Sequence, residues 1–481
     1  MVKFYITTPI YYVNDVATIG HAYTTVAADI LARWHRLNND KVFFLTGLDE
    51  NSQKTVTAAK KLGVKNIQKY TDEMADKWKN VWKVLNISYD DFIRTTEERH
   101  KKFVKEFFMK VYKKGDIYKG NYEGLYCEGC EDFKKESDLI NGKCPYHKVE
   151  PKKIVEENYF FRLSNYGEKV LDYINKNPEF IGPKSRKNEV ISFIKMGLKD
   201  ISISRPNAEW GIELPIDKKH KFWVWFDALS NYISAAKEYW PAELHLLAKD
   251  ILKFHCVIWP AMLLSAGYKL PKQIFSHGFL TVNGQKMSKS LGNAINPLHL
   301  SEKYGADSLR YFLIREIPFG EDGDFSEDAL KSRINNELAN DLGNLVSRVL
   351  TLVEKNFKIL KKSKLDNSLI SKLDLNKIQE YFDKYELHNT LSEIWKFINE
   401  VNKHINQEEP WKLKGKELEK HLYTLLESLR IISILIYPFM PETSEKINKQ
   451  LGIKLGLLKD CKFELIKEYK VKKEGVLFKK I

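Results

Sequence analysis

The sequence has few cysteines and no long apolar run. Only 5 of its 481 residues are cysteine, too few for the disulfide scaffold of a small secreted domain. No run approaches the roughly 20 apolar residues that a membrane-spanning helix needs. Residues 1–7 lack the apolar segment of a secretory signal, so we expect a cytoplasmic protein that does not enter a membrane. The 12% aromatic content argues against a disordered chain.

Three of the five cysteines lie close together in the sequence, beside a histidine. They form two short pairs, Cys127 with Cys130 and Cys144 with His147. Thiolates and an imidazole at this spacing are typical ligands of tetrahedral Zn²⁺, and a closed set of four suits a structural ion. We therefore predict one structural Zn²⁺ held by Cys127, Cys130, Cys144 and His147.

The positive charge is uneven along the chain. The whole sequence has a net charge of +14, and residues 331–481 contain 29 basic and 21 acidic residues, or +8. A basic last third is consistent with a polyanionic partner such as nucleic acid. A lysine-rich surface without such a partner explains the composition equally well.

The first 50 residues have the pattern of a strand, a helix and a second strand. An apolar run at 2–8 is closed by Pro9, helical spacing begins at Gly20, and a compact apolar run follows at 42–46. This pattern predicts a parallel sheet that binds ligands at the carboxyl ends of its strands. Strand-like runs return at 245–247 and 273–277. From about residue 335 the sequence is helical, which fits an α-helical bundle.

Two short motifs are suited to phosphate chemistry. The T-I-G-H segment at 18–21 lies between the first expected strand and helix, where a small backbone and free N–H groups can approach an anion. The K-M-S-K-S segment at 286–290 has two lysines three residues apart on a mobile-type loop, where they can neutralise a pyrophosphate leaving group. Taken alone, the first could be an ordinary helix start and the second a solvated basic loop.

Together the two motifs resemble the paired signatures of class I aminoacyl-tRNA synthetases. Three further segments are similar to the methionyl-tRNA synthetase family: Y-I-T-T-P-I-Y-Y-V-N at 5–14, T-G-L-D-E at 46–50 and W-V-W-F-D-A at 223–228. A single Cys₃His zinc knuckle matches one subgroup of that family. The resemblance implies a ligase that activates methionine with ATP to methionyl-adenylate, releases pyrophosphate, and transfers methionyl to the 3′ end of tRNA-Met.

The resemblance implies an α/β fold with a Rossmann-type parallel-sheet catalytic domain, a zinc-bearing insertion and an all-α bundle. The expected divisions are 1–114 for the first half of the catalytic domain, 115–230 for the insertion, 231–330 for the second half with the stem-contact region, and 331–481 for the anticodon-binding bundle. The tail at 477–481 resembles a terminal strand that packs on the catalytic domain. Nothing resembling the family's appended dimerising domain follows it, so we expect a monomer.

The resemblance also implies site residues at the positions that match the family's motifs. The catalytic residues that stabilise the phosphates would be His21, Lys286 and Lys289. Mg²⁺ would accompany ATP, whose expected binding residues are Asn14, Thr18, Gly20, His21, Lys249, Asp250 and Lys289. A thioether needs an apolar, polarizable slot. The expected methionine-binding residues are Ile10, Tyr12, Asp49, Trp225, Ala228, Leu229, Tyr232 and His277. Among them Asp49 would accept from the α-ammonium group, and Tyr12 or His277 would lie near the sulfur.

Three residues in the last third match the family's anticodon readers. Asn344 and Arg348 lie four apart and so share a helix face, where they would bond base edges. Trp411 follows a Glu-Pro pair and would stack on an unpaired base. The expected partners are therefore ATP, L-methionine and both initiator and elongator tRNA-Met.

The sequence departs from the family's usual pattern at several motif positions. Thr18 stands where histidine is usual, Asn51 and Ser52 replace His-Gly, Ala248 replaces a glycine, and Leu229 replaces a small residue or proline. A synthetase for another amino acid is one alternative. The 115–230 segment is too short for the editing domain of the Ile, Val and Leu enzymes, and a Cys enzyme would be expected to hold zinc at its amino-acid pocket. A non-catalytic tRNA-binding paralogue is the second alternative.

Overall fold

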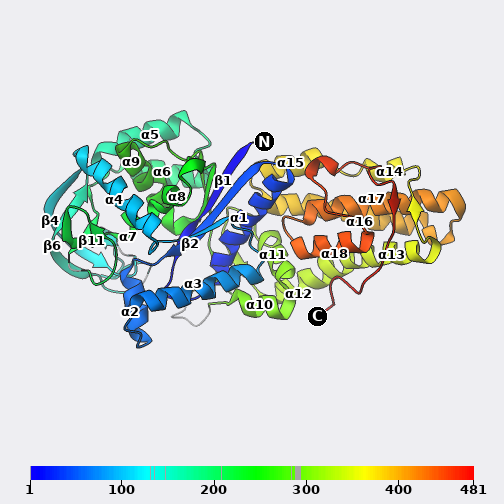
Figure 1. Ribbon diagram of the computed structural model, residues 1–481, viewed down its shortest axis with the longest axis horizontal. Coiled ribbons are helices and arrows are strands. Elements are labelled where there is room, and N and C mark those ends of the chain that lie inside the picture. The colour runs from blue at the N-terminus through cyan, green and yellow to red at the C-terminus, as the bar shows by residue number, and fades with distance from the viewer. Residues whose placement is uncertain are drawn as a thin grey trace.

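The chain forms an elongated molecule with an α/β part at one end and a bundle of long helices at the other (Figure 1). The computed structural model describes residues 2–130, 132–134, 136–146, 148–206, 208–282, 284–287 and 294–481. Within these ranges, no helix is both long and apolar enough to cross a membrane. The structure confirms the predicted fold class, a parallel-sheet α/β region followed by helices.

A six-stranded parallel sheet forms the centre of the α/β part. Its strand order is β3-β2-β1-β12-β13-β7. The bounds are β1 Lys3–Tyr12, β2 Lys41–Asp49, β3 Asp91–Arg94, β7 Ile181–Gly182, β12 Leu244–Ala248 and β13 Gln273–His277. The strand order reverses at β1, between β2 and β12, and in such open sheets the crevice beyond the carboxyl ends at this point is the ligand site.

The predicted strand, helix and strand at the start of the chain are confirmed. β1 is buried along most of its length, as expected for a parallel strand covered on both faces. α1, Ile19–Leu37, crosses to β2 with fifteen of its residues buried. Gly47 in β2 permits close strand packing, because a Cβ there would lie 2.1 Å from the carbonyl oxygen of Ile93 in β3. The edge strand β3 has only four residues, two of them charged, and was not predicted from the sequence.

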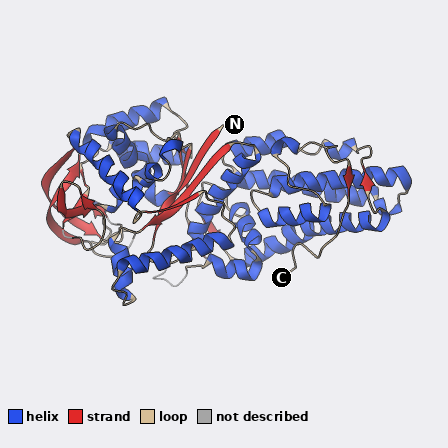
Figure 2. Cartoon of the chain, viewed as in Figure 1, coloured by secondary structure: helices blue, strands red, loops and turns tan. Residues whose placement is uncertain are grey.

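Helices flank the sheet, and a second sheet extends from the far end of the α/β part (Figure 2). Besides α1, the longer helices of this part are α2 Gln53–Lys61, α3 Ile67–Val84, α4 Glu98–Lys113, α5 Gly167–Lys176, α6 Lys184–Lys195 and α9 Trp259–Ala266. The second sheet is antiparallel, with the order β5-β4-β6-β8 and bounds β4 Ile117–Cys127, β5 Asp132–Lys134, β6 Lys152–Phe161 and β8 Ile201–Ser202.

Short elements complete the α/β part. A three-stranded sheet holds β9 Ser204–Pro206, β10 Glu213–Leu214 and β11 Asp217–Phe222. The short helices α7, Val224–Leu229, and α8, Asn231–Ser234, follow it directly. After β13, a further small sheet contains β14 Leu280–Val282, β15 Gln285–Lys286 and β16 Gly323–Phe325. It is accompanied by α10 Pro297–Tyr304, α11 Ala306–Arg315 and α12 Glu327–Arg333.

The last third is the predicted helical bundle. A π-helical segment at Ile334–Gly343 leads into α13, Asn344–Asn356. The other helices are α14 Asn367–Ile370, α15 Leu375–Asp383, α16 Leu387–Glu408, α17 Gly415–Ile436 and α18 Pro441–Leu451, with a two-stranded pair of β17 Leu360–Lys361 and β18 Glu468–Tyr469. α17 is buried on nearly all sides, which explains its run of Leu and Ile.

The chain end differs from the sequence expectation. Residues 477–481 form no strand. The backbone of Ile481 instead exchanges two hydrogen bonds with the side chain of Asn335, at 2.8 and 2.9 Å. The tail thus docks on the π-helical start of the bundle, because an amide side chain there offers both a donor and an acceptor to an extended backbone.

Candidate active site

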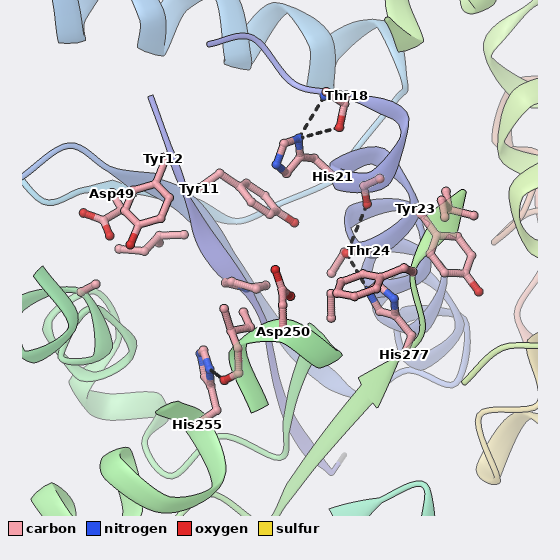
Figure 3. A pocket seen from close by; sticks show the side chains of 18 of the residues that line it. Tyr11, Tyr12, Thr18, His21, Tyr23, Thr24, Asp49, Asp250, His255 and His277 are labelled. Atoms are coloured by element: carbon pink, nitrogen blue, oxygen red, sulfur yellow. Dashed lines mark hydrogen bonds between the residues drawn. The ribbon is translucent and has the colours of Figure 1, made fainter. Parts of the chain in front are cut away.

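A cavity of about 380 Å³ lies at the carboxyl ends of the central strands, where the strand order reverses. Its walls come from the end of β1, from the last residue of β2, and from residues that follow β12 and β13. α1, α7 and α8 provide the remaining sides. In Figure 3, Tyr12 and Asp49 lie together at one end and Thr18 with His21 at another. The parallel topology therefore gathers segments far apart in the sequence around one space.

All eight residues predicted to bind methionine line this cavity: Ile10, Tyr12, Asp49, Trp225, Ala228, Leu229, Tyr232 and His277. Asp49 is buried at the end of β2, at 3% exposure. Trp225 stacks on Phe254 with ring centroids 3.8 Å apart and nearly parallel planes. The structure thus forms an apolar, aromatic slot with one carboxylate in its wall.

Most of the residues predicted to bind ATP line the same cavity: Asn14, Thr18, Gly20, His21 and Asp250. Lys249 does not line it. Its ammonium is paired with Asp322, at 2.6 and 2.8 Å from the two carboxylate oxygens, and the residue faces a neighbouring cavity. The predicted role of Lys249 therefore requires its ammonium to exchange Asp322 for a phosphate.

Thr18 and His21 form a compact cap at the start of α1. The backbone N–H of Thr18 donates to Nδ1 of His21 at 3.0 Å, and the Thr18 hydroxyl lies 3.1 Å from the same nitrogen. Because Nδ1 accepts, the neutral imidazole carries its proton on Nε2. Tyr11 and Trp78 contact the ring edge-on, each with centroids 5.1 Å away. The backbone N–H at position 18 thus sets the tautomer of His21, and the Thr18 hydroxyl adds a second contact to the same nitrogen.

His277 has both ring nitrogens engaged within the protein. Nδ1 donates to the carbonyl of Gly278 at 2.7 Å, and Nε2 accepts from the hydroxyl of Thr24 at 2.7 Å. Burial lowers the pKa of His277 to about 4, so the ring is neutral at neutral pH. His277 lines the cavity, but its polar atoms face Thr24 and Gly278.

Sequence reasoning missed His255, a buried cavity residue. Its Nδ1 donates to the carbonyl of Ile251 at 3.0 Å, and its Nε2 accepts from the hydroxyl of Tyr232 at 2.7 Å. Burial lowers the pKa of His255 to about 4. The available signal was its place five residues after Asp250, at the start of an apolar run that becomes a π-helical turn. Tyr232 and His255 thus form a neutral, hydrogen-bonded pair in the wall of the cavity.

Two departures from the family pattern have structural roles behind the cavity. Asn51 donates to the carboxylate of Asp227 at 2.8 Å, and the other oxygen of Asp227 lies 2.6 Å from Nε2 of His100. Ser52 caps α2 by accepting from the backbone N–H of Thr55. These contacts tie the end of β2 to α7, which carries the aromatic wall of the slot.

The K-M-S-K-S segment is described only in part. The backbone of Lys286 belongs to β15, and Met287 lines the cavity. Lys289 lies outside the described residues, and the Lys286 side chain is not described either. The described part of the segment thus runs from the small sheet that follows β13 to the cavity wall at Met287.

Three thiols converge at the end of β4, in the antiparallel β5-β4-β6-β8 sheet. The sulfurs of Cys127, Cys130 and Cys144 lie within 4.8 Å of one another, and those of Cys130 and Cys144 are 3.5 Å apart. Burial raises the pKa of Cys130 to about 12, so a bound cation would be needed to hold its thiolate at neutral pH. His147 lies outside the described residues. The donor set fits a thiolate-preferring metal such as Zn²⁺.

The predicted anticodon readers lie in the bundle. Asn344 is the first residue of α13 and is exposed, and Arg348 follows one turn later. The Arg348 guanidinium donates to the side chain of Asn406 on α16 at 2.7 Å. Trp411, in the turn after α16, is 50% exposed rather than buried in the core. An exposed indole at a hairpin tip is available for stacking.

Comparisons with known proteins agree with this geometry. A family model described as "tRNA synthetases class I (M)" matches residues 4–153 and 137–350, and one described as "Anticodon-binding domain of tRNA ligase" matches 367–477. A curated relative from Caldanaerobacter subterraneus, named methionine–tRNA ligase, is 49% identical over 99% of this chain and 79% of its own length. A relative of the same name from Thermotoga maritima is 47% identical over 94% of this chain and 75% of its own length.

Solved structures give the same result. A Mycobacterium tuberculosis methionyl-tRNA synthetase in complex with methionyl-adenylate superposes with a TM-score of 0.95 at 39% identity, covering 99% of this chain and 100% of that one. The apo form from the same organism has a TM-score of 0.87 at 36% identity, covering 100% of this chain and 98% of that one. With the family models and curated relatives covering nearly its whole length, the chain belongs to the methionyl-tRNA synthetases of class I.

Proposed function

We propose that this chain joins methionine to tRNA-Met in two steps. In the first, a methionine carboxylate oxygen attacks the α-phosphorus of ATP, the bond to the bridging oxygen breaks, and pyrophosphate leaves. In the second, a hydroxyl of the 3′-terminal adenosine of tRNA attacks the activated carbonyl, loses its proton, and AMP leaves. Neither step needs a covalent enzyme intermediate, so the protein contributes positioning and electrostatic stabilisation.

The methionine end of the site is the apolar slot. Trp225, Leu229 and Tyr232 offer polarizable and apolar surface to the thioether. Asp49 would accept from the α-ammonium group, which leaves the methionine carboxylate directed toward the nucleotide. Tyr12 or His277 would lie near the sulfur. Both nitrogens of His277 are engaged with Thr24 and Gly278, so this ring would meet the thioether through its carbon atoms.

The phosphate end of the site is the start of α1. The N–H on Nε2 of His21 would donate to a phosphate oxygen, helped by the positive end of the helix. Lys286 and Lys289 would neutralise charge on the leaving pyrophosphate, and Asp250 would hold the ribose hydroxyls. Mg²⁺ keeps most of its ligands from phosphate and water, so it would enter with ATP and offset phosphate charge.

A second cavity of about 620 Å³ adjoins the first and shares Tyr12, Trp225 and Asp250 with it. Four lysines line it: Lys54, Lys134, Lys249 and Lys253. Cys130 of the thiol cluster borders it as well. Three carboxylates, of Asp138, Glu189 and Asp250, line it too. A cavity with several lysines that opens onto the adenylate site would receive the 3′ end of tRNA. A Zn²⁺ held by the cysteines and His147 would fix the loop that forms this wall.

The bundle would bind the anticodon arm. Its net charge of +8 suits a phosphate backbone, and Trp411, Asn344 and Arg348 supply stacking and hydrogen-bonding groups on the hairpin side. We propose that the four divisions at 1–114, 115–230, 231–330 and 331–481 act in these roles. We also propose that the enzyme works as a monomer in the cytoplasm, where tRNA, ATP and methionine are present together.

A single observation carries the proposal: one cavity contains both the aromatic slot and the phosphate-facing helix start. The test is charging of initiator and elongator tRNA-Met with labelled methionine and ATP. We expect both tRNAs to be charged and AMP to form in equal amount. Binding of tRNA without charging would support the non-catalytic paralogue instead.

A further inference from the structure

Two histidines and an aspartate converge inside the helical bundle, on the opposite side of the molecule from the thiol cluster. Nε2 of His404 on α16 lies 3.2 Å from Nδ1 of His421 on α17. Nδ1 of His421 lies 3.8 Å from Oδ2 of Asp366, just before α14. All three potential ligand atoms lie within 4.8 Å of one another. The imidazoles are 5% and 4% exposed, so the cluster is almost closed to solvent.

The surrounding structure holds these groups in place. α16 and α17 are both 22 residues long and lie side by side (Figure 1). Asp366 is held from two directions, because its backbone N–H donates to the Thr424 hydroxyl on α17 and its Oδ1 accepts from the backbone N–H and hydroxyl of Ser368. With Oδ1 committed to this cap, Oδ2 is the oxygen that faces the histidines.

We infer that Asp366, His404 and His421, which we name the bundle clasp, bind a first-row divalent transition metal, with Zn²⁺ the best match. Two nitrogens bound at 2.0–2.1 Å to a tetrahedral ion are about 3.3 Å apart, close to the observed 3.2 Å. Two imidazoles and a carboxylate form a three-ligand set that leaves a fourth position for water.

A further carboxylate completes the arrangement. Oε2 of Glu408 lies 3.8 Å from Nε2 of His421, the nitrogen that would not bind the metal. Metal-bound histidines commonly donate their other N–H to a carboxylate, which fixes the tautomer and strengthens the ligand. Lys420 opposes metal binding, because its ammonium lies 3.7 Å from Oδ2 of Asp366. A metal ion would displace this ammonium toward solvent.

A metal ion at the bundle clasp would join the two helices of the hairpin that carries Trp411. His404 precedes Trp411 by seven residues and His421 follows it by ten, so the metal would join the two arms of the hairpin that presents this indole. Under the proposed function, it would preorganise the anticodon-binding tip and lower the KM for tRNA. Metal binding itself does not depend on that function.

The test is the number of zinc ions bound per chain. The protein is stripped with a chelator, reloaded with Zn²⁺ and dialysed before zinc is measured. His404→Gln with His421→Asn is the key variant, because each amide lies where the ligand nitrogen was and can keep the hydrogen bond, yet binds Zn²⁺ weakly. We expect it to hold about one zinc fewer per chain than the parent. The matched control is His388→Gln on the same helix, which should lose none. Equal zinc in the parent and the key variant would overturn the inference.

The absorption spectrum of bound Co²⁺ distinguishes metal at the bundle clasp from metal at the thiol cluster. A Cys127→Ser, Cys130→Ser chain loaded with Co²⁺ should keep d–d absorption without thiolate charge-transfer bands, and absence of Co²⁺ would also overturn the inference. Asp366→Asn, which keeps the Oδ1 cap, should weaken metal binding, and Lys420→Met should tighten it. If the key variant does not fold, these two single variants decide. Failure of tRNA charging with the zinc count intact would contradict the proposed function alone.

Discussion

Removal of the Tyr232 hydroxyl should lower the free energy of unfolding, whereas removal of the Tyr23 hydroxyl should not. Tyr232 and Tyr23 both line the cavity and are 2% and 1% exposed. The Tyr232 hydroxyl donates to Nε2 of His255 at 2.7 Å, whereas that of Tyr23 has no hydrogen-bond partner among the described residues. Tyr232→Phe therefore leaves a buried imidazole nitrogen without its donor. Such a loss costs about 1–3 kcal/mol.

The assay is urea denaturation of Tyr232→Phe beside Tyr23→Phe, its matched control. We expect Tyr232→Phe to lower the free energy of unfolding by about 1–3 kcal/mol at unchanged m-value, and Tyr23→Phe to leave it unchanged or raised. Since the slot is where methionine would bind, Tyr232→Phe should also lower kcat/KM for methionine more than Tyr23→Phe does. Equal effects of the two variants on stability would refute the reasoning.

Three further predictions follow from the phosphate end, the hairpin tip and the buried histidines. Lys289→Ala should lower adenylate formation by roughly 10²–10³-fold with little change in methionine binding, and comparable rates of pyrophosphate exchange would exclude its role. Trp411→Ala should raise KM for tRNA by the equivalent of about 1–3 kcal/mol and leave pyrophosphate exchange unchanged. The pKa values of His255 and His277, about 4 when folded against 6.5 when unfolded, mean that the unfolded chain binds more protons between these values. The contribution of these histidines to the free energy of unfolding should be fully present above pH 6.5 and be lost toward pH 4, at up to about 1.4 kcal/mol per pH unit for each histidine. In His277→Gln, the urea midpoint should depend less steeply on pH. A midpoint that does not change with pH in the parent would contradict this.

The sequence predicted the parts of the fold whose signals are local. The strand-helix-strand start, the strand at 273–277 and the helical last third all have clear apolar periodicity, and each lies where expected. β3 was missed because four residues with charged ends give no pattern. The tail was misassigned because its docking depends on Asn335, a contact that only the folded chain creates.

The candidate site was also predicted only in part: the residues that line the cavity were predicted, and their side-chain contacts were not. The match to the family's motifs predicted which residues line the cavity. The parallel topology explains why those at the ends of β1, β2 and β13 meet there. Side-chain direction was not predictable. Lys249 pairs with Asp322, and the nitrogens of His277 face Thr24 and Gly278. The Tyr232 hydroxyl bonds His255, a residue that was not among the predicted ones. These contacts join residues from different elements, so no single segment of sequence contains the signal.

The central claim is that one cavity activates methionine with ATP. The most direct measurement is ATP–pyrophosphate exchange with each amino acid in turn, using this chain without tRNA. Methionine should support exchange, and isoleucine, valine, leucine and cysteine should support far less. Preferential exchange with any of these four, or no exchange with methionine, would contradict the account.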